Sequence, residues 1–130
     1  MKRLCLDTSA YSNFQRGEPR VVERMDRAEW IGMPAIVVGE LWTGFLLGMR
    51  VDENIAALEA FLRHHVVETL PVDGETGRIF GEIFLDLRRK GRPLPTNDIW
   101  IAAIAAQSGA SVLTFDEHFR EIARVSAIIL

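Results

Sequence analysis

The sequence lacks the parts that several common enzyme classes require. It has a single cysteine, Cys5, so it can form neither an internal disulfide nor a zinc site built on a cysteine pair. It has no glycine-rich phosphate loop with a lysine and no G-x-S-x-G motif, which excludes P-loop nucleotide hydrolysis and the α/β-hydrolase nucleophile. The net charge of −3 gives no general attraction to nucleic acid, so any such binding needs a local patch or a metal.

Long apolar runs and targeting segments are also missing. The apolar stretch after Lys2 and Arg3 is only three residues long before Asp7, too short for the core of a signal peptide. The longest hydrophobic segment, residues 34–49, contains Glu40 and is shorter than a membrane span. We therefore expect a soluble, cytoplasmic protein that does not associate with membranes.

The sequence instead alternates short apolar runs with longer helical patterns. With 130 residues, 48% of them hydrophobic, it can bury the core of one domain, expected to span residues 1–130. Strands are expected at residues 3–6, 30–33, 66–70, 112–115 and 127–130. The main helices are expected at residues 18–28, 34–49, 75–90 and 97–107, with another after Asp52. Helices between short strands imply an α/β fold with a mainly parallel central sheet flanked by helices.

Capping residues and apolar spacing give further expectations for the helices. Asp52 and Thr96 are predicted N-caps, and Gly91 and Gly109 are predicted to end their helices. Apolar residues in segment 75–90 recur at helical spacing, which predicts an inward-facing stripe. The members of this stripe are Ile79, Phe80, Ile83, Phe84 and Leu87.

Four acidic residues fall where this fold would bring side chains together. Asp7 and Asp116 each follow a strand, at the sheet edge where ligands bind in open α/β proteins. Glu40 and Asp98 lie in otherwise apolar helices, where a buried carboxylate is costly unless it is paired or bound to a cation. Converging carboxylates repel one another, and Mg²⁺ or Mn²⁺ would relieve that repulsion. The pattern predicts metal-assisted attack on a phosphodiester.

Each of these acids also has a simpler structural interpretation. Asp7 and Asp116 could begin turns by bonding to local backbone groups. Asp98 lies in a first helical turn, where a negative charge suits the helix dipole, and the helix of Glu40 could roll to expose it. The joint placement of the four acids, rather than any one of them, supports a common site. The three histidines show no spacing typical of metal ligands.

The four acids lie in four short stretches of the sequence: LCLDTSAYSNF, PAIVVGELWTG, LPTNDIWIAAIA and VLTFDEHF. Together, these stretches resemble the PIN domain family, most closely its VapC-type toxins from toxin–antitoxin operons. The resemblance implies that all four acids are catalytic. It implies that Asp7 and Asp98 bind the metal directly and that Asp116, which matches the most variable acid of the family, acts on it through water. It also implies that Glu40 is the helical acid of the cluster. Small polar residues would support the acids: Thr8, Ser9 and Thr114.

The resemblance further implies an activity and partners. The protein would be an endoribonuclease that uses Mg²⁺ or Mn²⁺, with Glu40 or Asp116 orienting the attacking water or taking its proton. The expected partners are an RNA substrate, a VapB-type antitoxin and a second copy in a homodimer. Segment 34–49 has more large apolar residues than one buried face requires, so it is the expected docking surface. Two alternatives stay open: a PIN-type nuclease of RNA processing, and a non-catalytic RNA-binding or regulatory module.

Overall fold

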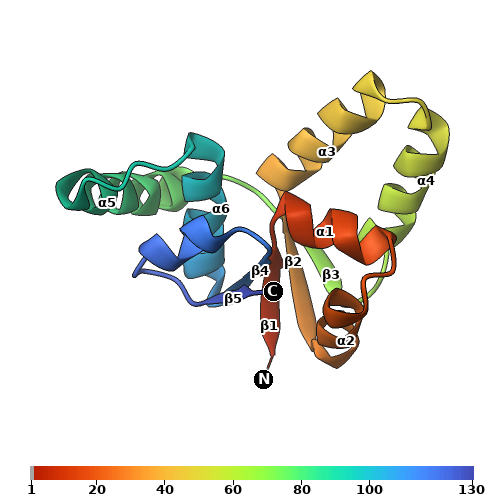
Figure 1. Ribbon diagram of the computed structural model, residues 1–130, viewed down its shortest axis with the longest axis horizontal. Coiled ribbons are helices and arrows are strands. Elements are labelled where there is room, and N and C mark those ends of the chain that lie inside the picture. Colours follow the sequence, from red (N-terminus) through yellow and green to blue (C-terminus); the bar gives the residue numbers. More distant parts are fainter. Residues whose placement is uncertain (1) are drawn as a thin grey trace.

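The computed structural model describes residues 2–130 and is built around one parallel β-sheet (Figure 1). The strands are β1 (Arg3–Leu6), β2 (Trp30–Pro34), β3 (Val67–Leu70), β4 (Ser111–Thr114) and β5 (Ala127–Ile129). The helices are α1 (Thr8–Gln15), α2 (Pro19–Arg27), α3 (Ala35–Leu47), α4 (Val51–Leu62), α5 (Gly74–Lys90) and α6 (Thr96–Ser108), followed by a 3₁₀ helix at Glu117–Glu121. Helices α1 to α4 lie on one side of the sheet, and α5 and α6 lie on the other (Figure 1). The predicted α/β class is confirmed.

Strand β1 occupies the centre of the sheet, whose strand order is β3-β2-β1-β4-β5. Its residues Leu4, Cys5 and Leu6 are all buried, as expected for a parallel strand covered by helices on both faces. The chain first builds outward from β1 through β2 to β3, and then crosses back to add β4 on the other side of β1. The carboxyl ends of β1 and β4 therefore form the topological switch point, where open α/β sheets bind ligands.

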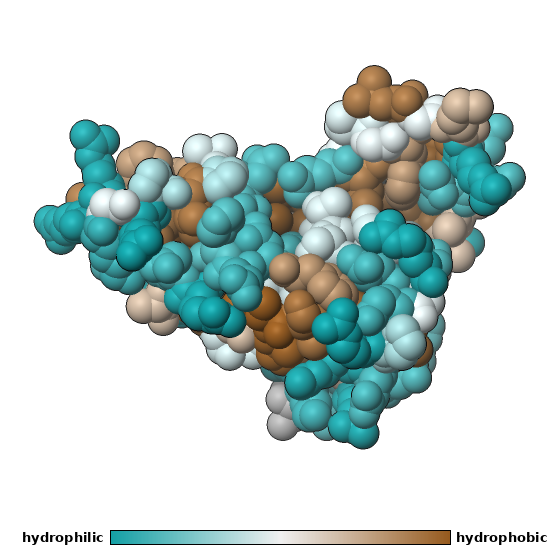
Figure 2. Space-filling model, viewed as in Figure 1, coloured by the Kyte–Doolittle hydropathy of each residue, from teal (hydrophilic) through white to brown (hydrophobic). Residues whose placement is uncertain are grey.

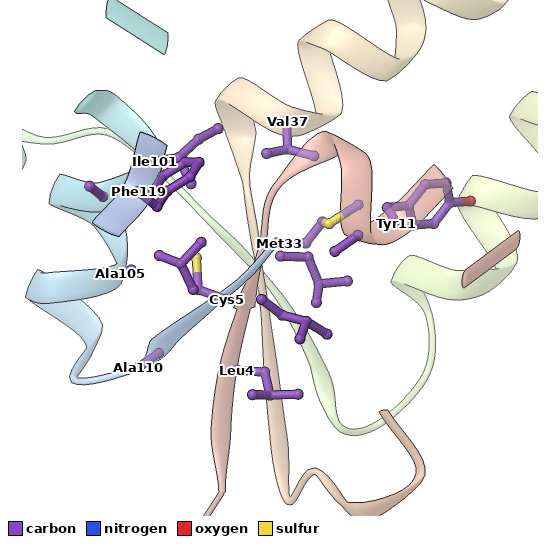
Figure 3. Close-up of a cluster of buried hydrophobic side chains, with 14 of the residues drawn as sticks. Leu4, Cys5, Tyr11, Met33, Val37, Ile101, Ala105, Ala110 and Phe119 are labelled. Atoms are coloured by element: carbon purple, nitrogen blue, oxygen red, sulfur yellow. The ribbon is translucent and has the colours of Figure 1, made fainter. Parts of the chain in front are cut away.

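The hydrophobic core fills the spaces on both sides of the sheet (Figure 3). Tyr11 from α1, Met33 from β2 and Val37 from α3 pack on one side, and Ile101 and Phe119 pack on the other. Gly32 in β2 is the most closely surrounded of the glycines, because a Cβ atom there would lie 2.6 Å from side-chain carbons of Leu70 and Trp30. No helix within residues 2–130 has both the length and the apolar character needed to cross a lipid bilayer.

The predicted helix ends are partly correct. Gly91 and Gly109 follow α5 and α6 in the left-handed conformation, with φ of 67° and 65°, as expected for glycines that end helices. The prediction that Asp52 is an N-cap was wrong. Helix α4 begins at Val51 with Arg50 as its N-cap, so Asp52 lies in the first turn of the helix. The prediction for Thr96 was also wrong. Pro95 holds the N-cap position with its extended backbone, so Thr96 is already helical and caps nothing.

The inward-facing stripe of α5 is narrower than predicted. Its buried apolar residues Ile79, Ile83 and Leu87 repeat every four positions. Phe84 is 42% exposed, contrary to the prediction, although its ring stacks on Phe80 at 6.1 Å between centroids. Helix α5 extends beyond the sheet and packs mainly on α6, so only one narrow face is covered (Figure 1).

The carboxyl end of α3 presents apolar side chains to solvent. Helix α3 leads into α4 as a hairpin that projects from the rest of the molecule, and Figure 2 shows hydrophobic atoms at its tip. The exposed residues there include Leu46, at 62%, and Met49, at 98%. Trp42 lies one turn earlier and is also exposed, whereas Val37 and Leu41 on the opposite face are buried.

Candidate active site

Asp7 lies at the switch point and is the N-cap of α1. Its Oδ1 accepts hydrogen bonds from the Ala10 amide at 2.8 Å and from the Ser9 hydroxyl at 2.7 Å. Its Oδ2 accepts a hydrogen bond from Thr114. The side chain is almost fully buried, so these three donors replace the water that an ionised carboxylate loses on folding.

Hydrogen bonds of Thr114 and Ser9 connect the end of β4 to the segment that follows β1. The buried hydroxyl of Thr114 donates to Asp7 and accepts from the Asp116 amide at 2.8 Å. The Ser9 hydroxyl similarly accepts from the amide of Phe115 at 3.0 Å. The end of β4, and with it Asp116, is therefore fixed relative to the start of α1.

Glu40 reaches this edge from α3 and is held by two other elements. Its Oε1 accepts from the Thr8 hydroxyl at 2.6 Å, and its Oε2 accepts from the Asn97 amide at 3.3 Å. Thr8 begins α1, and Asn97 lies in the first turn of α6. Sequence reasoning did not identify Asn97 as a site residue. The available signal was an amide side chain directly before Asp98 at a helix start.

Asp98 lies close enough to the other three acids for their charges to affect its pKa. Burial raises the pKa of Asp98 to about 6, and the negative charges of Asp116, Asp7 and Glu40 contribute to the rise. The pKa of Asp7 is also raised by burial, but its hydrogen-bond donors oppose this effect. No hydrogen-bond donor among the described residues lowers the pKa of Asp98. The negative charge of Asp98 is therefore less compensated than that of Asp7.

His118 is a second residue that sequence reasoning set aside. Its Nδ1 lies 3.1 Å from Oδ1 of Asp116, and its backbone amide donates to the same oxygen at 2.9 Å. Its charge also lowers the pKa of Asp98, so it acts on a second acid of the site. Histidine spacing in the sequence gives no sign of this role, because the partner of His118 is a carboxylate rather than another histidine.

The chemistry of these side chains suits a hard divalent cation. Carboxylate oxygens are the ligands that Mg²⁺ and Mn²⁺ prefer, and uncompensated charge at Asp98 would favour a cation nearby. In residues 2–130 the side chains do not bring three or more Asp, Glu, His or Cys residues into reach of one ion. Hydrogen bonds to Ser, Thr and Asn side chains instead hold Asp7 and Glu40 at the edge of the site.

Comparison with known proteins gives consistent similarities along the whole chain. The PIN domain family model matches residues 4–125. Ribonuclease VapC5 of Mycobacterium tuberculosis is 31% identical over 117 residues, which cover 88% of this chain and 83% of the relative. The structure of VapBC-5, a toxin–antitoxin system of the same organism, matches with a TM-score of 0.78, 26% identity and complete coverage of both chains. DNA-bound VapBC from Salmonella typhimurium matches with a TM-score of 0.86 and 25% identity, covering 99% of this chain and 98% of the other.

Proposed function

Because this chain belongs to the PIN domain family, we propose that it is a metal-dependent endoribonuclease and the toxin of a VapBC-type toxin–antitoxin pair. The observation that carries this proposal is the raised pKa of Asp98, caused by burial and by three neighbouring carboxylates. A cluster that served only stability would gain by losing some of this charge. A nuclease centre needs the charge, because it must bind a cation.

We infer a division of roles among the acids. Asp7 and Asp98 would bind Mg²⁺ or Mn²⁺ directly, and Asp116 would act on the ion through a water molecule. When bound, the ion lowers the pKa of a water molecule and neutralises charge on the phosphate. Ser9, Ala10 and Thr114 donate to Asp7 and so oppose the rise of its pKa that burial causes.

Glu40 is the best-placed residue to handle the attacking water. Thr8 and Asn97 each donate a hydrogen bond to a different oxygen of its carboxylate, which fixes its orientation. Glu40, or alternatively Asp116, accepts a proton from water as the water oxygen attacks phosphorus. The bond from phosphorus to the 3′-oxygen breaks, and the leaving oxygen takes a proton from solvent, so that the products are a 5′-phosphate and a 3′-hydroxyl.

Cleavage of RNA by purified protein tests the activity. With millimolar Mg²⁺ or Mn²⁺ the wild type should cleave RNA, and EDTA should stop it. Glu40→Gln keeps the size of the side chain and removes its charge, so activity should fall about 100-fold or more, as for loss of a general base. Glu59→Gln, at an exposed position on α4, is the matched control and should keep full activity. Equal activity of Glu40→Gln and wild type, at equal melting temperature, would remove Glu40 from the mechanism.

The proposal includes a VapB-type antitoxin and a homodimer as partners. The exposed apolar end of α3 supports this part, because soluble proteins usually cover such residues with another chain. Trp42→Ala should weaken one of these associations by about 2 kcal/mol, as expected for an aromatic anchor. Sedimentation of the folded protein, with and without antitoxin, measures both. Unchanged association of the folded variant would exclude Trp42 from either interface.

A further inference from the structure

A hollow of about 360 Å³ lies between α1 and the hairpin of α3 and α4. Helix α1 begins at Asp7, and α3 carries Glu40, so the hollow lies between the two helices that deliver these acids. Its wall includes Tyr11, Gln15, Arg16, Phe45, Arg50 and Asn54. None of the residues that line it is acidic, although the chain as a whole has a net charge of −3.

Tyr11 lines this hollow and has an unpaired polar atom. The residue is 2% exposed, and its hydroxyl has no hydrogen-bond partner within residues 2–130. Burial raises the pKa of Tyr11, and the nearby side chain of Gln15 opposes the rise without reaching hydrogen-bond geometry. The hydroxyl points away from the sheet, towards α4 (Figure 3). A buried hydroxyl without a partner is destabilising, so an acceptor brought by a ligand would stabilise the complex.

Two arginines give the hollow a positive charge. Arg16 forms no ion pair with the described residues, and Arg50 has only a loose contact of 3.8 Å with the exposed Glu53. Guanidinium groups bind carboxylates and phosphates with paired hydrogen bonds. The unpaired hydroxyl and the two arginines therefore favour the same kind of ligand, an anion with oxygen acceptors.

The surroundings of the hollow favour a peptide over a nucleic acid. Phe45 forms an apolar part of the wall, and the neighbouring Leu46 and Met49 are 62% and 98% exposed. Aliphatic side chains pack well on the aliphatic residues of a peptide, whereas nucleic-acid bases require aromatic faces or hydrogen bonds. A segment that combines an acidic residue with aliphatic neighbours matches both parts of this surface.

We propose that this hollow receives an acidic side chain of a peptide segment whose aliphatic neighbours cover the exposed end of α3. The carboxylate accepts hydrogen bonds from the Tyr11 hydroxyl and from the guanidinium groups of Arg16 and Arg50. The inference rests on the proposed function only in assigning this segment to the antitoxin. Such a segment would bridge α1 and α3 and so fix the helices that position Asp7 and Glu40.

Selection from a random twelve-residue peptide library displayed on phage tests the proposal with the full chain. Selected peptides should contain a Glu or Asp next to Leu, Ile, Val or Met. Replacing that acid by Gln or Asn should weaken binding about tenfold or more, because a charge-assisted hydrogen bond is lost. The double variant Arg16→Gln/Arg50→Gln should show the same loss, and Tyr11→Phe a smaller one. Arg63→Gln, outside the hollow, is the matched control and should bind like wild type.

Three results would overturn the proposal. The first is that no peptide is enriched above background, and the second is that selected peptides bind equally well to the double variant. The third is that a twelve-residue RNA, tested in EDTA to stop metal-dependent cleavage, loses affinity in the double variant while peptides do not. That last result would make the hollow a phosphate site. Binding does not require activity, so Asp98→Asn should bind peptides normally, and failure of RNA cleavage would leave this test intact.

Discussion

Replacing Asp98 by Asn should stabilise the metal-free protein while it abolishes activity. Asn has nearly the same size as Asp but cannot ionise. The folded protein pays an electrostatic cost to ionise Asp98, because the side chain is half-buried and three other acids lie nearby. Removing the charge removes this cost, and it also removes one proposed ligand of the metal.

The size and pH dependence of this effect follow from the pKa of Asp98, which is raised from 3.8 to about 6. Since one pKa unit corresponds to about 1.4 kcal/mol, the whole rise would amount to about 3 kcal/mol at neutral pH. Solvent screening of a half-buried group reduces this to about 1 kcal/mol. A raised pKa favours the protonated folded state, so this contribution is complete below about pH 4 and is lost as the pH rises through about 6. The advantage of Asp98→Asn should therefore appear across that window.

Urea denaturation in EDTA at pH 4 and at pH 7.5 measures this advantage. Asp98→Asn should gain about 1 kcal/mol relative to wild type between the two pH values. Asp26→Asn, at an exposed position on α2, should show no such gain. Millimolar Mg²⁺ should stabilise the wild type more than the variant, because binding to the native state alone raises stability. An advantage that is absent at pH 7.5, or equal at both pH values, would show that burial and the neighbouring acids do not raise the pKa of Asp98 as described.

Other predictions concern stability at sites away from Asp98. Thr114→Val removes a buried donor to Asp7 and should lower the free energy of unfolding by about 2–3 kcal/mol; a loss below about 1 kcal/mol would show that this hydrogen bond matters little. Gly32→Ala places a Cβ 2.6 Å from side-chain carbons and should cost about 1–2 kcal/mol, seen as a lower melting temperature; an unchanged melting temperature would mean that the neighbours move freely. Ile83→Ala should cost about 3 kcal/mol and Phe84→Ala less than about 1.5 kcal/mol in urea denaturation, and equal losses would contradict their different burial.

The central strand and the fold class could be predicted from the sequence because their signals are local. The run Leu4-Cys5-Leu6 is apolar at every position and ends at a polar turn, which is the pattern of a strand covered on both faces. The helix starts at Asp52 and Thr96 were less predictable. A capping side chain indicates that a helix begins nearby, but the backbone conformation decides at which residue. At Thr96 the extended ψ of 142° at Pro95 decided it.

The four acids could be placed at one sheet edge from the order of strands and helices alone. The contacts that hold them could not, because they join distant parts of the chain. Asn97 bonds to Glu40 across 57 residues, and neither residue alone indicates the other. The exposure of Phe84 was unpredictable for a similar reason. Helical spacing predicts the face of the helix on which a side chain lies. How far the neighbouring helix reaches decides whether that side chain is covered.

The hydrogen bond between Thr114 and Asp7 has a consequence for how the protein is made. These residues lie 107 positions apart, so the site joins one of the first segments to leave the ribosome with one of the last. At roughly 5–20 residues per second, about 5–20 seconds of synthesis separate them. During this interval a nascent chain has Asp7 and then Glu40, but neither β4 nor Asp116 to complete the edge of the sheet. With the proposed site incomplete, we expect truncated chains that end before β4 to leave RNA intact, so that nuclease activity would begin only when translation is nearly complete.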